Sequence, residues 1–230
     1  MRSIKPLLTC AMLMLCAAAG CGMAPHVLYG KPIAGQVVDA DTGQPVAGAH
    51  VAYVWESTIV PSGFTGHNSR TICYHAAATT TDAQGRFRVE PWRKWSTYDV
   101  VVSDPIALVY ARGYTPRQIV LQEGPVTPPT ERTSERYAVK GFSGTVDERM
   151  HVLFWGLANR GCHYGKESQK SLYPMLKAIH DEARTAARTT EQQETVLVIA
   201  RLAAKAALAI DPNGPGSDAA LQSFIEEHLR

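Results

Sequence analysis

The chain has 230 residues, of which 45% are hydrophobic and 19% are charged, a composition typical of globular proteins with a buried core. It contains 23 lysines and arginines and 21 aspartates and glutamates. Two of the basic residues, Arg2 and Lys5, lie in a segment that we expect to be removed, which leaves 21 against 21. Without a basic excess, the chain does not have the charge that attracts phosphate backbones, so nucleic acid is not an expected partner.

Residues 1–20 have the pattern of a bacterial export signal, with a basic start, an apolar stretch and a small-residue end. The apolar stretch is too short to form a stable transmembrane helix. The ending Ala18-Ala19-Gly20-Cys21 resembles a bacterial lipobox. The resemblance implies that Cys21 is lipidated and that the protein is anchored by lipid and faces the periplasm. The alternative is an ordinary cleaved signal followed by a chance cysteine. Because Gly22 is not the aspartate associated with inner-membrane retention, the resemblance implies the outer membrane.

Residues 21–31 are rich in turn formers and predict a short tether. After them, apolar residues recur with a period of two between turn residues, the pattern of short strands. The first hairpin turn is predicted at Asp39–Gly43 and a similar turn at Asp82–Gly85. The predicted strands cover residues 33–39, 49–56, 85–90, 97–103, 107–111, 117–122 and 136–140.

Two segments resemble the carboxypeptidase regulatory-like domain, a small transthyretin-like fold. The first reads Ile-Ala-Gly-Gln-Val-Val-Asp and continues into Gly-Gln-Pro-Val-Ala-Gly-Ala, and the second reads Thr-Asp-Ala-Gln-Gly-Arg-Phe. The matching residues are Ile33, Gly35, Val37, Asp39, Gly43, Pro45, Val46, Gly48, Ala49, Val51, Thr81, Asp82, Gly85 and Phe87. The resemblance implies a seven-stranded antiparallel β-sandwich over residues 32–141. It names a scaffold and does not define an activity.

A long insertion and the cysteine count predict a cross-link between the two parts of the chain. The family needs only a short link where this chain has about twenty residues between Glu56 and Ala78, which we expect to form an irregular loop. Cys10 and Cys16 leave with the signal and Cys21 is acylated, so Cys73 and Cys162 remain. In an oxidising periplasm these two are expected to form a disulfide. The alternative is a pair of buried thiols.

From residue 142 to the C-terminus the apolar period becomes helical, which predicts an α-helical region. The first helix starts at a capping box, Thr145–Glu148, and ends at Gly161. The second is expected to begin at Ser171, and the third at a capping box on Thr190. A last short helix is expected to begin at Ser217. These amphipathic helices need an apolar surface, either the face of the β-domain or one another. Together, the β-sandwich expected over residues 32–141 and the helices expected over residues 142–230 predict a protein of the α+β class.

The sequence contains no metal-ligand spacing and no nucleophile motif of a known catalytic type, so no catalytic residue, metal or cofactor is assigned. Trp92, Trp95 and Tyr98 cluster beside basic residues and are candidates for an aromatic platform that binds a glycan. The alternative is that one tryptophan covers the core and the other is half exposed.

These observations favour a non-catalytic lipoprotein that acts as a binding or assembly module for another envelope protein or a glycan. The alternative function is that of an enzyme, or an enzyme accessory, acting on envelope polysaccharide through the region of Trp92 and Trp95. A binding module is expected to have a flat contact surface or an exposed strand edge. An enzyme is expected to have a cleft near these tryptophans.

Overall fold

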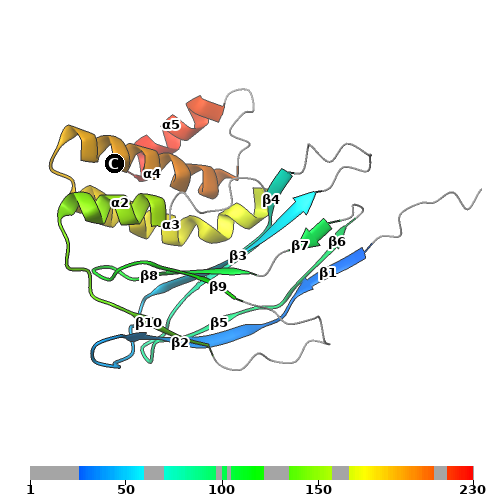
Figure 1. Ribbon diagram of the computed structural model, residues 1–230. Coiled ribbons are helices and arrows are strands. Elements are labelled where there is room, and N and C mark those ends of the chain that lie inside the picture. Colours follow the sequence, from blue (N-terminus) through cyan, green and yellow to red (C-terminus); the bar gives the residue numbers. More distant parts are fainter. Residues whose placement is uncertain are drawn as a thin grey trace, which may run out of the picture.

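The computed structural model describes residues 26–59, 70–96, 100–102, 105–121, 135–156, 166–209 and 217–229. These residues form a mixed α+β fold with ten strands and four helices (Figure 1). The strands are β1 (His26–Gly30), β2 (Ile33–Asp39), β3 (His50–Ile59), β4 (Arg70–Thr80), β5 (Arg86–Val89), β6 (Trp92–Ser96), β7 (Val100–Val102), β8 (Ile106–Tyr110), β9 (Arg117–Val120) and β10 (Glu135–Val139). The helices are α2 (Val146–Gly156), α3 (Lys166–Ala186), α4 (Thr190–Leu208) and α5 (Ser217–His228).

The strands form three sheets. A three-stranded sheet has the order β10-β2-β5, and a five-stranded sheet has the order β4-β3-β8-β9, with β7 also paired to β3. The third sheet is the two-stranded pair β1-β6. Strands β10 and β2 are parallel, whereas the other pairs are antiparallel. The prediction of seven antiparallel strands is therefore wrong, both in the number of strands and in this parallel pair.

Alternating residues of the central strand β3 serve two different apolar clusters. Val51, Tyr53 and Trp55 pack in one cluster with residues of β2, β5 and β10. Ala52 and Val54, which point to the opposite face, pack in a second cluster with the helices. Both faces of the central strand are therefore buried over residues 51–55, as expected for a stretch in which every residue is apolar.

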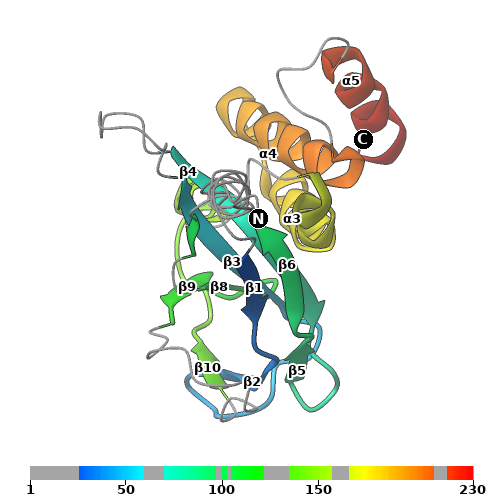
Figure 2. The ribbon, with the colours of Figure 1, turned by 90° about the vertical axis from the view of Figure 1, so that its right-hand side faces the viewer.

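The helices form a layer on the face of the five-stranded sheet that points away from the three-stranded sheet (Figure 1). Leu108 and Tyr110 of the sheet share a buried cluster with Leu172 and Ile179 of α3. The prediction that the amphipathic helices need an apolar partner is confirmed in both of its forms. Helix α3 packs on the sheet, and the other helices pack mainly on α3 and on one another. Figure 2, which views the molecule from the side, shows the helices above the sheets and β1 and β6 in front.

The predicted turns are present and use the expected side chains. Asp39 Oδ1 accepts hydrogen bonds from the backbone N–H groups of Asp41 and Thr42, at 2.9 and 2.8 Å. Asp82 Oδ1 accepts in the same way from Gln84 and Arg86, at 2.9 and 2.8 Å. Gly85 has a φ of 68°, a conformation that other residues rarely adopt, which explains the glycine at this position.

Two segments expected to be irregular contain strands. The predicted tether ends in β1, and the second half of the predicted loop between Glu56 and Ala78 is β4, which pairs along the length of β3. Strand β4 shows no apolar alternation in its second half, because Ala76, Ala77 and Ala78 offer little hydrophobic contrast and two threonines follow them. Tertiary pairing with β3 determines this strand.

Helices α3 and α4 begin at other residues than predicted, because the residues expected to cap them do not do so. Helix α3 already includes Lys166, and Ser171 lies inside it, with its hydroxyl donating to the carbonyl O of Ala76 on β4 at 2.9 Å. The N-cap of α4 is Thr189, not Thr190, and it forms a capping box with Gln192. The predicted end of the first helix at Gly161 lies outside the described residues.

Candidate functional site, a groove between three helices

Helices α3 and α4 form an antiparallel hairpin that supports the candidate site. A three-residue turn, 187–189, joins them, and the capping box at Thr189 starts α4 directly after it. The buried face of α4 carries Ala200, Ala203 and Ala204, and Ala183 faces them from α3. Because these side chains are small, the two helices pack closely, and larger residues at the margins line the space beside them.

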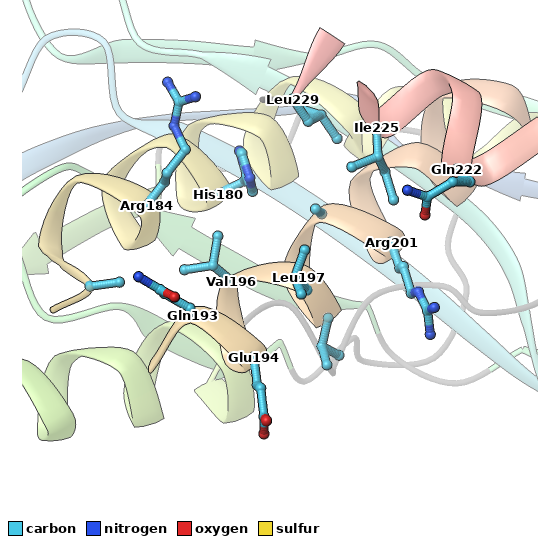
Figure 3. A pocket seen from close by; sticks show the side chains of 13 residues that line it. His180, Arg184, Gln193, Glu194, Val196, Leu197, Arg201, Gln222, Ile225 and Leu229 are labelled. Atoms are coloured by element: carbon cyan, nitrogen blue, oxygen red, sulfur yellow. The ribbon is translucent and has the colours of Figure 1, made fainter. Parts of the chain in front are cut away.

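A cavity of about 650 Å³ lies beside this hairpin, where α5 approaches α4 (Figure 3). We call it the helical groove. Helix α3 and the turn that follows contribute His180, Arg184 and Ala187, and α5 with the residue after it contributes Gln222, Ile225 and Leu229. Helix α4 supplies the rest of the lining, namely Gln193, Glu194, Val196, Leu197, Val198, Ala200 and Arg201.

The floor of the groove is apolar and part of its rim is apolar as well. Val196, Ala200 and Ile225 are buried in the helical cluster and form the floor. On the rim, the side chain of Leu197 is 57% exposed and Val198 is also exposed. Large apolar side chains at the mouth of a cavity are a feature of surfaces that bind another molecule.

His180 is the titratable group at the base of the groove. Its side chain is almost completely buried, and its Nδ1 lies 3.2 Å from Asp181 Oδ1. Burial lowers the pKa of His180, and the neighbouring Asp181 carboxylate opposes this effect. The buried ring closes the base of the groove, with its Nδ1 directed toward Asp181.

Charged side chains surround the apolar part of the groove. Arg184 of α3 and Arg201 of α4 are both exposed, and they lie on opposite sides of the view in Figure 3. Glu194 is exposed on the same rim. Two cations and one carboxylate leave an excess of positive charge around an apolar surface.

A second cavity, of about 440 Å³, lies between α2 and the start of α4. It combines aromatic side chains with carboxylates and an amide, and its lining is Asp147, Met150, His151, Phe154, Trp155, Glu191, Gln192 and Thr195. Trp155 is exposed and its ring packs edge-on against Phe154 at 4.9 Å. Gln192 Nε2 donates to Asp147 Oδ1 at 2.6 Å and links the two helices at this cavity.

The structure separates the two tryptophans of the predicted aromatic platform. Trp92 is buried and packs against Trp55 and His75, with ring centroids 5.4 and 4.7 Å apart. Trp95 lies on the other face of β6 and is exposed, and Tyr98 is outside the described residues. Neither of the two cavities is lined by Trp92 or Trp95.

The predicted lipidation site, Cys21, and one predicted disulfide partner, Cys162, lie outside the described residues. Cys73 is on β4, its Sγ is 3.6 Å from the carbonyl O of His75, and its sulfur belongs to a disulfide. The residue bonded to Cys73 is not among those that the structure describes, so its pairing with Cys162 stays a prediction.

Among the described residues, no group of three or more His, Cys, Asp or Glu side chains is arranged to hold a metal ion. Likewise, no helix in the described part of the chain is both long and apolar enough to cross a membrane.

The sequence interpretation missed the helical groove. The helical apolar spacing places Val196 and Ile199 on the inner face of the third helix and gives Leu197 and Val198 no role. Two adjacent large apolar residues on the outer face of an amphipathic helix were the available signal, because that face is normally polar.

Comparison with known proteins adds no assignment: no family model matches the chain, and no curated protein is significantly similar to it.

Proposed function

We propose that this protein is a non-catalytic, lipid-anchored module of the bacterial envelope that binds an apolar segment of another envelope protein in the helical groove. The observation that carries the proposal is the exposure of Leu197 and Val198 beside an apolar floor. Burial of such a rim residue on binding contributes about 1.5–3 kcal/mol, which gives a partner a reason to occupy the groove.

The charges of the rim define the partner further. An apolar segment that carries a carboxylate would place its negative charge near Arg184 or Arg201. Arginine forms two parallel hydrogen bonds to a carboxylate, so it adds orientation as well as attraction. The proposed partner is therefore an apolar, acidic segment of a protein.

For the β-domain, we propose the transthyretin-like β-sandwich that the sequence resemblance implies. It is supported by the cluster that Val37 of the three-stranded sheet shares with Tyr53 and Val109 of the five-stranded sheet. In this proposal the β-domain is a rigid support, Cys21 carries the lipid in the outer membrane, and the helices carry the binding site.

A glycan is the second candidate ligand, and it belongs to the cavity between α2 and α4. Exposed Trp155 could stack on a sugar ring while Asp147, Glu191 and Gln192 accept or donate hydrogen bonds to its hydroxyls. This form of the proposal replaces Trp92 and Trp95 with Trp155 as the aromatic contact. It fits an accessory role on envelope polysaccharide.

Site-specific photo-crosslinking in living cells tests the first candidate. A photoreactive phenylalanine analogue placed at Leu197 is compared with the same analogue at Val120, since the two side chains are 57% and 61% exposed and Val120 is on β9, away from the groove. We expect a discrete adduct from position 197 only, whose cross-linked peptide is apolar and contains an acidic residue.

The variant Arg184→Glu/Arg201→Glu in the same strain is expected to reduce that adduct strongly, because it reverses the charge of the rim. Equal labelling from positions 197 and 120, or no adduct from position 197, would show that the helical groove is not a protein-binding site. Cross-linking to peptidoglycan fragments from position 155 and not from 197 would favour the glycan.

A further inference from the structure

The two-stranded sheet β1-β6 continues the pairing of β2 with β5. Gly30 pairs with Trp92 and Ile33 pairs with Val89, so the register is unchanged across the interruption. Between the two pairs stand Pro32 on one strand and Pro91 on the other. Proline has no N–H for the ladder. In this register Pro32 is opposite Glu90 and Pro91 is opposite Lys31, so two successive pairs each lack a backbone donor, which interrupts the hydrogen bonding and leaves β1-β6 as a separate ribbon.

The face of the ribbon that is exposed changes at this interruption. On β2 and β5 the odd-numbered residues, such as Ile33 and Val89, are buried. On β1 and β6 the odd-numbered residues are exposed, while Gly30 and Trp92 are buried. The ribbon therefore turns outward the set of positions that would face the core in a continuous sheet.

This outward face carries large apolar and aromatic side chains together with a cation. Val27 is directly opposite Trp95, and Tyr29 is directly opposite Arg93. All four are exposed, and the side chain of Trp95 is 71% exposed. We call these four residues the ribbon face. On its opposite face the same ribbon buries Trp92 in the core, which fixes the position of the ribbon. The ribbon face itself is not covered by any of the described residues.

We infer that the ribbon face lies in the headgroup layer of the membrane that holds the lipid anchor. The inference rests on the proposed lipidation of Cys21. Only four residues, 22–25, separate Cys21 from His26, the first residue of β1. Five Cα–Cα steps span at most about 17 Å, so the ribbon is the described element that the anchor keeps nearest to the lipid.

The composition of the ribbon face matches that layer. Tryptophan and tyrosine concentrate at the membrane–water interface because their rings are amphipathic, and arginine binds lipid phosphates there. Tyr29, Arg93 and Trp95 supply these three groups on one face. An interfacial contact next to the anchor adds to the retention that the acyl chains provide and restricts rotation of the domain.

This placement also orients the molecule. In both ribbon views, β1 and β6 lie well apart from α5, which forms one side of the helical groove (Figures 1 and 2). With the ribbon face on the membrane, the groove is held away from the lipid and remains accessible to a partner.

Depth-dependent fluorescence quenching tests the inference with the full-length, lipidated protein. The protein is reconstituted in vesicles of phosphatidylethanolamine and phosphatidylglycerol that contain a headgroup-nitroxide phosphatidylcholine. The wild type is compared with Trp95→Phe and with Trp155→Phe. Trp155 is a matched control because it is also exposed, at 54% against 71%, and lies on α2. We expect headgroup quenching in the wild type, its loss in Trp95→Phe, and its retention in Trp155→Phe.

Flotation of the same vesicles separates this inference from the proposal on which it rests. If the wild type does not float, the anchor itself is wrong. If it floats and the Trp95 signal is not quenched, the ribbon face is not at the membrane. If isolated peptidoglycan, and not lipid, shields the Trp95 fluorescence from a quencher, the inference is also overturned and the ribbon face is assigned to a glycan.

Discussion

Arg149 of α2 and Glu182 of α3 form a buried ion pair that attaches both helices to the sheet. Arg149 Nε donates to Glu182 Oε1 at 2.7 Å, and Nη2 lies 2.6 Å from the same oxygen. The side chains are only 6% and 11% exposed. Tyr110 of β8 donates to the other carboxylate oxygen at 2.7 Å, and burial together with this carboxylate raises the pKa of Tyr110.

Removal of one charge from this pair is expected to be strongly destabilising. In Glu182→Gln the guanidinium of Arg149 stays buried without its counter-ion, which costs about 3–5 kcal/mol. Urea unfolding followed by circular dichroism measures the change. The exposed control Glu194→Gln is expected to change the free energy of unfolding by less than about 0.5 kcal/mol. A similar small effect of both variants would show that the pair does not hold the layers together.

Acidification is expected to destabilise the protein through His75. Burial, with a smaller contribution from the Lys94 charge, lowers the pKa of His75 from 6.5 to about 4 in the folded protein. Between these two pH values the unfolded chain binds the proton and the folded chain does not, so stability falls as the pH decreases through this window.

The variant His75→Phe keeps an aromatic ring against Trp92 and removes the titration. Its unfolding midpoint in urea should therefore fall less between pH 7 and pH 4 than that of the wild type. Phenylalanine at the exposed His151 is the control and should leave the wild-type dependence intact. Identical pH profiles for wild type and His75→Phe would contradict the role of His75.

Gly30 is expected to be intolerant of a side chain. A Cβ at this position would overlap the indole ring of Trp92, which packs over the glycine backbone. Gly30→Ala should therefore cost about 1–3 kcal/mol, as overpacking of a core does, and should shift the tryptophan emission. Gly141→Ala, where the space around the added Cβ is open, should be close to neutral. Equal stability of the two variants would show that the ribbon can move away from Trp92.

The predicted disulfide between Cys73 and Cys162 remains to be tested directly. In the chain-entropy model, a disulfide that closes the loop from residue 73 to residue 162 stabilises the folded protein by about 4–5 kcal/mol. Peptide mapping of unreduced protein from the periplasm should recover one cross-linked peptide with both residues, and thiol labelling after unfolding should find neither free. Two reactive thiols, or Cys73 bonded to another cysteine, would refute the pairing.

Lipidation of Cys21 predicts a diacylglyceryl adduct on the N-terminal peptide of the membrane fraction, measured by mass spectrometry. Cys21→Ala should move the protein to the soluble fraction, because no acyl chain then holds it to the bilayer. If Cys21→Ala remains tightly membrane-bound, the proposed anchor is incorrect.

The elements that the sequence determined are those in which the deciding contacts are local. The turn at Asp39 uses backbone groups two and three residues away, and the capping box of α4 closes within one helical turn, although its N-cap is one residue earlier than predicted. The apolar period places the inner face of each helix because a helix repeats its direction every few residues. The α+β class follows from these local patterns.

The tertiary structure decided the features that depend on distant residues. Strand β4 exists because it pairs with β3, and Ser171 donates to Ala76, 95 positions earlier, instead of capping a helix. The helical groove is formed by three helices, so no single segment contains it. Trp92 and Trp95, three residues apart on β6, point to opposite faces of the strand, and the tertiary structure decides which of these faces the core covers. Burial depends on which surfaces the fold brings together, and the spacing of residues along the chain does not specify those surfaces.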